Sequence, residues 1–123
     1  MQSRRVLFVD DEPALVSLTV RALDKLGYQV TGVSDPRKAL DLFRADPTAF
    51  DVVVTDLSMP SVSGFDLARE ICQFRPDLPL LLMSGFVSQR DLDESIACGI
   101  REIIHKPFTI EKLISKLDQL FPE

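Results

Sequence analysis

Residues 6–11 read Val-Leu-Phe-Val-Asp-Asp, a short apolar run that ends in two carboxylates. Three later apolar runs also end in a polar side chain, namely Asp56, Ser84 and Lys106. Near-continuous apolar runs of this length are typical of parallel strands that are buried on both faces. In an open parallel sheet, ligands bind outside the carboxyl ends of the strands. The sequence therefore predicts that these polar side chains form one site at one edge of a sheet.

Apolar strands alternate with amphipathic segments along the chain. Strands are predicted over residues 5–9, 28–33, 50–55, 80–84 and 102–105, and helices over 13–26, 36–44, 65–74, 89–98 and 110–120. The residues at the expected helix ends agree with this pattern: Pro13 and Pro36 at first turns, Gly27 and Gly99 after last turns, and Ser88 with Asp91 and Thr109 as caps. We predict an α/β fold, a doubly wound, flavodoxin-like five-stranded parallel sheet with strand order 2-1-3-4-5.

In that strand order a crevice opens between the first and third strands. Asp10 and Asp11 would lie on one side of it and Asp56 on the other, with Ser84 and Lys106 following the next two strands. Crowded carboxylates repel one another unless they are protonated or neutralised by a cation, and Mg²⁺ prefers such oxygen ligands. An Asp carboxylate can also attack phosphorus to form an acyl phosphate. An ammonium and a hydroxyl would stabilise the charge of the transferring phosphoryl group.

Length and composition exclude several classes of protein. The 123 residues match one domain, which we place over 1–123. The chain is 46% hydrophobic and 27% charged, and its net charge of -5 argues against direct binding to nucleic acid. Apolar runs are far shorter than the roughly 20 residues of a membrane span, so no direct membrane contact is expected. With no signal-peptide pattern and no metal-type spacing of Cys72 and Cys98, a cytoplasmic protein with free thiols is expected.

The whole chain resembles the response regulator receiver domains of two-component signalling. The resemblance is carried by Val-Asp-Asp-Glu-Pro at 9–13, Thr-Asp-Leu-Ser-Met-Pro at 55–60, Ser-Gly at 84–85 and Lys-Pro-Phe at 106–108. It implies a signalling switch, rather than an enzyme, that accepts a phosphoryl group on Asp56 from a histidine kinase or a histidine phosphotransfer domain. The switch would assist its own phosphorylation and dephosphorylation.

The same resemblance implies a role for each residue of the site. Asp11, Asp56 and the backbone carbonyl of Ser58 would ligate Mg²⁺, while Asp10 would order the waters of the metal. Ser84 would bond the phosphoryl group and Lys106 would pair with it, which gives Asp56, Ser84 and Lys106 as the reacting set. The resemblance also implies a cis Lys106–Pro107 bond.

One position departs from the family pattern. The aromatic residue usually found three residues before the lysine is Ile103 here, so a ring that swings inward on phosphorylation is lacking. We therefore expect phosphorylation to change the surface around strand 80–84, helix 89–98 and strand 102–105 less than in relatives with the ring. Residues 96–107 are also similar to receivers at the C-terminal end of hybrid sensor histidine kinases.

Three competing classes of protein can be tested against the sequence. A flavodoxin-like carrier needs a phosphate-binding loop after the first strand, where the acidic residues 10–12 would repel phosphate. A phosphatase of the haloacid dehalogenase type needs a second Asp two residues after its nucleophile, where this chain has Ser58. A receiver-shaped interaction module that signals without phosphorylation remains the alternative, although such a module is expected to lose acidic or lysine positions.

The first helix carries two apolar stripes. At 100° per residue, Leu15, Leu18, Ala22 and Leu26 share one face, which we assign to the sheet. Val16, Val20 and Leu23 form a second stripe, which is predicted to be partly exposed and to dock the helices of a histidine kinase or phosphotransfer domain. The alternative is that this second stripe packs on the neighbouring fifth helix.

Overall fold

The computed structural model describes residues 4–85 and 88–121 and contains a five-stranded parallel sheet in the order β2-β1-β3-β4-β5. The strands are β1 Arg5–Val9, β2 Gln29–Val33, β3 Val52–Asp56, β4 Leu80–Ser84 and β5 Glu102–His105. The helices are α1 Pro13–Asp24, α2 Pro36–Ala45, α3 Gly64–Phe74, α4 Gln89–Ala97 and α5 Ile110–Leu120. The predicted fold class and strand order are confirmed, and strand and helix ends differ from the prediction by two residues or fewer.

The helix ends follow from local chemistry. Ser88 and Asp91 form a capping box at the start of α4, and Thr109 caps α5 by accepting a hydrogen bond from the Lys112 N–H. Gly27 and Gly99 have φ values of 92° and 78°, which glycine adopts at little steric cost. The Lys106–Pro107 bond is cis, as predicted.

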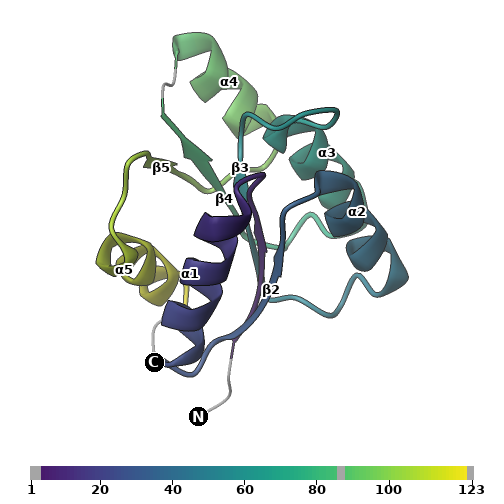
Figure 1. The fold of residues 1–123 in the computed structure, drawn as a ribbon. Coiled ribbons are helices and arrows are strands. Elements are labelled where there is room, and N and C mark those ends of the chain that lie inside the picture. The colour runs from purple at the N-terminus through teal and green to yellow at the C-terminus, as the bar shows by residue number, and fades with distance from the viewer. Residues whose placement is uncertain (1–3, 86–87, 122–123) are drawn as a thin grey trace.

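Helices cover both faces of the sheet, with α1 and α5 on one side and α2 and α3 on the other (Figure 1). Alternate residues of β1 point into the two cores, so that Val6 and Phe8 pack with α1 and α5, whereas Leu7 and Val9 pack with α2 and α3. Strands β3 and β4 are buried along their whole length, as expected for central parallel strands. The two cores fix the strand ends that carry the polar residues.

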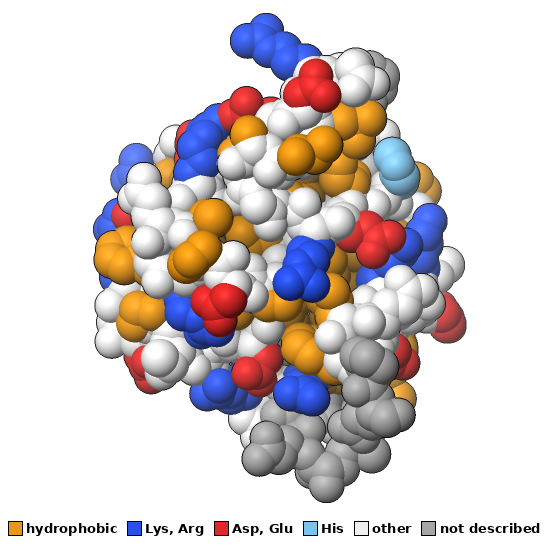
Figure 2. All heavy atoms as spheres, turned by 180° about the vertical axis from the view of Figure 1, so that it is seen from behind, with side chains coloured by type: hydrophobic (Ala, Val, Ile, Leu, Met, Phe, Trp, Pro, Cys, Tyr) orange, Lys and Arg blue, Asp and Glu red, His pale blue; other side chains and the backbone are white. Residues whose placement is uncertain are grey.

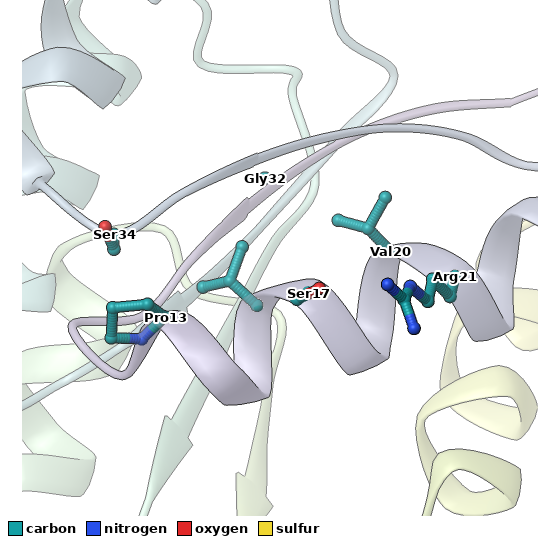
Figure 3. A pocket seen from close by; sticks show the side chains of 7 residues that line it. Pro13, Ser17, Val20, Arg21, Gly32 and Ser34 are labelled. Atoms are coloured by element: carbon teal, nitrogen blue, oxygen red, sulfur yellow. The ribbon is translucent and has the colours of Figure 1, made fainter.

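The prediction for the faces of α1 was wrong. Val16 and Leu23 are buried against the sheet, whereas Leu18 and Leu26 are 59% and 55% exposed. The cause lies in Gly32 of β2, where an added Cβ would lie 2.6 Å from both Val16 and Val20. Val20 points toward this strand across a groove of about 400 Å³ between α1 and β2 (Figure 3).

Helix α4 packs differently from the other helices. Ser95 is its one buried residue, and Leu92 and Ile96 are exposed. Figure 2 shows hydrophobic side chains near the top of the molecule, where Figure 1 places α4, and side chains of both charge signs interspersed over the face below. Within the described residues, no helix is long and apolar enough to cross a membrane.

Candidate functional site

Three carboxylates meet at the carboxyl edge of the sheet. Asp10 and Asp11 follow β1, Asp56 ends β3, and oxygens of all three lie within 4.8 Å of one another. Asp10 is fully buried and Asp56 is 6% exposed, whereas Asp11 is open to solvent. The carboxylate of Asp10 also accepts a hydrogen bond of 2.9 Å from the Glu12 N–H. The predicted acidic triad is therefore assembled, with one member facing solvent, where a hydrated cation has access.

Lys106 connects the two sides of the crevice. Its Nζ lies 2.8 Å from Asp10 Oδ2 and 3.4 Å from Asp56 Oδ1. The backbone N–H of Lys106 donates to the backbone oxygen of Ser84 at 2.8 Å, which holds the loop after β5 against the end of β4. The ammonium thus lies between a buried carboxylate of β3 and a buried carboxylate that follows β1, although the sequence separates these residues widely.

Two serines lie beside the triad. Ser84 is buried at the end of β4, and the Leu57 N–H donates to the backbone oxygen of Met83 at 2.9 Å, which brings the loop after β3 against β4. Ser58 and Ser84 line the same hollow of about 680 Å³. Of the predicted set, the structure joins the carboxylates and Lys106 directly and places Ser58 and Ser84 in the wall of this hollow.

The electrostatics of the site follow from burial and from these contacts. Burial raises the pKa of Asp56, the Lys106 ammonium opposes this rise, and the charges of Asp10 and Asp11 add to it. Burial alone would lower the pKa of Lys106, but the hydrogen bond to Asp10 and the charges of Asp10 and Asp56 raise it overall. The site thus holds a carboxylate that is destabilised in its ionised form beside a firmly protonated amine.

This balance predicts how stability depends on pH. A raised pKa means that the folded chain holds the Asp56 proton more tightly than the unfolded chain, so ionisation of Asp56 costs stability as pH rises above the ordinary value of 3.8. In metal-free buffer, Asp56→Asn should therefore increase the free energy of unfolding at pH 7, and the gain should be smaller at pH 4. Urea unfolding with a chelator present measures both values. A variant less stable than the wild type at pH 7 would show that the ion pair with Lys106 outweighs the burial.

Comparison with known proteins identifies the family. The sequence model of one protein family, the response regulator receiver domain, matches residues 6–118. The chain belongs to this family. The response regulator receiver protein CpdR of Brucella abortus is 28% identical over 95% of this chain and 96% of its own length. The sensor protein EvgS of Escherichia coli K12 is 30% identical over 94% of this chain but only 9% of its own length, so that likeness covers one part of a longer protein.

Solved receiver structures agree with the fold. The chemotaxis protein CheY4 of Vibrio cholerae has a TM-score of 0.89 and 27% identity, and the match covers 97% of this receiver and 99% of that chain. The response regulator protein TrrA of Thermotoga maritima, in complex with Mg²⁺-BeF, has a TM-score of 0.84 and 29% identity, with coverage of 96% and 99%. Phosphoacceptor function is typical of the family, so this receiver is a phosphoacceptor switch rather than a conventional enzyme. Receiver domains interact with histidine kinases.

Sequence reasoning missed two features of the site. Gly64 begins α3 with its Cα against the backbone of β3, since an added Cβ would lie 2.5 Å from the backbone oxygen of Asp56. Its only sequence signal was a glycine directly before the predicted helix 65–74. Asp91 lines the hollow beside Ser84, and its role as a helix cap gave no indication of this position.

Proposed function

We propose that this receiver accepts a phosphoryl group on Asp56 from a phosphorylated histidine of a kinase or phosphotransfer domain. The observation that carries the proposal is the bridge of Lys106 between Asp10 and Asp56, at 2.8 and 3.4 Å. A carboxylate held beside a fixed ammonium and two further carboxylates is suited to attack phosphorus and then to have its new charge neutralised.

The proposed reaction forms one bond and breaks one bond. A carboxylate oxygen of Asp56 donates an electron pair to phosphorus, the P–N bond of the phosphohistidine breaks, and the imidazole nitrogen retains that electron pair. Lys106 would pair with a phosphoryl oxygen and the Ser84 hydroxyl would donate to another, which stabilises the charge on the transferring group. Hydrolysis of the acyl phosphate by water would return the receiver to its original state.

The acidic triad is able to bind a metal, and we assign Mg²⁺ to it. The carboxylates of Asp11 and Asp56 and the backbone carbonyl of Ser58 would hold the ion, while Asp10 would order its waters. The donor set fits, because all candidate ligands are hard oxygens and the oxygens of the three carboxylates lie within 4.8 Å of one another. When bound, Mg²⁺ would neutralise charge on the phosphoryl oxygens.

These ligand roles predict unequal effects of two alanine substitutions. Asp10→Ala should weaken Mg²⁺ binding about tenfold, as is typical when a residue that supports the ligands is lost. Asp11→Ala should weaken it more, because a direct ligand is removed. Titration with MgCl₂, followed by amide chemical shifts, measures both affinities. Glu12→Ala is the control, since this neighbouring acid is outside the proposed site; equal losses for Asp10 and Asp11 would contradict the assignment.

We place the docking surface for the phosphodonor on the exposed face of α1. On one side of α1, Leu18 is exposed and Leu15 and Ala22 are half-buried, so these three residues form an apolar stripe, while the exposed Leu26 lies in the turn after the helix. Helix α1 begins directly after the Asp10–Asp11 loop, which brings a helix docked on this stripe close to Asp56. This stripe takes the docking role that the sequence predicted for Val16, Val20 and Leu23, because those residues face the sheet.

Leu18→Glu is expected to slow phosphotransfer from a protein donor about tenfold, because a charge in the centre of an apolar contact costs on the order of 1.4 kcal/mol or more. Phosphorylation by phosphoramidate should be unchanged. A purified histidine kinase, autophosphorylated on its histidine, serves as the donor. Ile96→Glu, at a 78% exposed site on α4, is the matched control. Equal slowing with both donors would show that Leu18 supports the fold rather than docking.

One further expectation concerns signal output. Ile103 is half-buried on β5, and without a ring at this position we expect a small displacement of α4 on phosphorylation.

The location of this receiver at the C-terminal end of a hybrid sensor kinase stays a prediction. A module that signals without phosphorylation is the alternative function, and it would retain the fold but give no phosphate adduct.

A further inference from the structure

A hollow of about 680 Å³ lies between the loop after β3 and the start of α4. It adjoins the site of the proposed function through Ser58 and Ser84, which belong to both. The other lining residues include the apolar Leu57, Met59 and Phe65 and the acidic Asp91. Asp91 is the one charged side chain among the described residues that line the hollow.

The position of Asp91 is fixed by the capping box of α4. Its carboxylate accepts a hydrogen bond of 3.2 Å from the Ser88 N–H, and its own N–H donates to Ser88 Oγ at 3.1 Å. The carboxylate is also favoured at a helix N-terminus, where the macrodipole is positive. A negative charge is therefore held in place in the wall of a pocket beside the reacting carboxylate.

We propose that this hollow receives the leaving group of the phosphodonor, and that Asp91 selects against leaving groups that carry negative charge. The inference rests on the proposed function. In an in-line transfer, the leaving group departs opposite the attacking oxygen of Asp56. A phosphohistidine or phosphoramidate loses its P–N bond and releases imidazole or ammonia, which is neutral or becomes cationic on taking a proton. An acyl phosphate loses its P–O bond and releases a carboxylate, which Asp91 repels.

The size of the effect follows from Coulomb's law. The two charges are those of Asp91 and an anionic leaving group in the hollow. The repulsion between two unit charges on the order of 8 Å apart in water is enough to slow a reaction about two- to threefold. The effect should weaken at high salt, because mobile ions screen charges that face solvent. The consequence for signalling is a receiver that responds to phosphohistidine proteins and is partly insulated from acyl phosphates of metabolism.

The test compares two small phosphodonors with opposite leaving-group charge. Wild type and Asp91→Asn are incubated with Mg²⁺ and either acetyl phosphate or phosphoramidate, and the rate of adduct formation is followed by intact mass. The asparagine side chain can still accept the bond from Ser88, so α4 keeps its cap. The rate with acetyl phosphate should rise about two- to threefold at low salt. The rate with phosphoramidate should stay constant or fall, so that the ratio of the two rates changes.

Asp66→Asn is the matched control. Asp66 occupies the same place in the capping box of α3, with Ser63 as its partner, but it does not line the hollow. This variant should leave the donor ratio at the wild-type value. Equal acceleration with both donors in Asp91→Asn, or the same ratio change in Asp66→Asn, would overturn the inference. Failure of the proposed function is distinguishable, because wild type would then form no adduct with either donor.

Discussion

Asp56→Asn is expected to abolish the phosphate adduct that forms when this receiver is incubated with phosphoramidate and Mg²⁺. The amide oxygen of asparagine is a far weaker nucleophile than a carboxylate and forms no acyl phosphate. The fold should survive, because the change removes a charge whose burial is unfavourable and leaves the volume of the side chain nearly constant. Intact mass before and after incubation measures the result, which should be one phosphate for wild type and none for the variant.

The control for this prediction lies at the other end of the same strand. Asp51 directly precedes β3 and pairs with Arg5 at 3.2 Å, away from the acidic triad. Asp51→Asn removes one carboxylate and the same charge, and it should leave the adduct intact. An adduct that persists in Asp56→Asn would assign the phosphoryl group to another residue. The absence of any adduct in wild type would favour the module that signals without phosphorylation.

Gly64→Ala is expected to destabilise this receiver by about 2–3 kcal/mol, because an added methyl group has no room. Its Cβ would lie 2.5 Å from the Asp56 backbone oxygen and 2.9 Å from both Leu57 Cα and Leu82 Cδ1. Two of these atoms belong to the backbone and cannot move aside as a flexible side chain can. Because the clash displaces the end of β3, the variant should also phosphorylate more slowly. Urea unfolding and the rate of adduct formation measure the two effects.

The sign of this effect separates it from helix propensity. In a helix without steric conflict, alanine is more favourable than glycine by up to about 1 kcal/mol, so propensity alone predicts a more stable variant. Gly85→Ala is the control for free energy of unfolding, since an added Cβ there meets no atom within 4 Å. It should change stability by about 0.5 kcal/mol or less. A Gly64→Ala variant as stable as wild type would show that the strand and α3 separate at low cost.

The strands and the acidic site were predictable because both leave simple patterns in the sequence. Buried parallel strands need apolar residues at every position, so β3 and β4 appear as continuous runs with a polar residue at the end. The strand order then places the ends of β1 and β3 on the two sides of one crevice. Asp10, Asp11 and Asp56 could be grouped from this argument alone, and the structure confirms that their carboxylates meet.

The orientation of α1 could not be obtained in the same way. Two apolar stripes run along this helix, and the periodicity of hydrophobic residues does not say which of them faces the sheet. The choice is made by tertiary packing, because Gly32 lets Val16 and Val20 approach β2 closely. Thr19, which the sequence presents as polar, is fully buried on the same face. A helix with two apolar stripes therefore needs information about the strand beneath it.

The hollow beside the site was also beyond the reach of the sequence. Its walls come from the loop after β3 and the start of α4, and no motif connects these segments. Asp91 is accounted for as a cap residue three positions after Ser88, a pattern that predicts a helix start and nothing about chemistry. Its second position, in the wall of a pocket that Ser84 shares, depends on how α4 is placed against the sheet.

Chemical identification of the phosphorylated residue tests the proposed role of Asp56 most directly. Sodium borohydride reduces the acyl phosphate of an aspartate to homoserine, which marks the residue that carried the phosphoryl group. Wild-type protein is phosphorylated with phosphoramidate and Mg²⁺, reduced, digested and sequenced by tandem mass spectrometry. Homoserine is expected at position 56 and unmodified aspartate at positions 10 and 11. Homoserine at either of those positions, with Asp56 unmodified, would contradict the role proposed for Asp56.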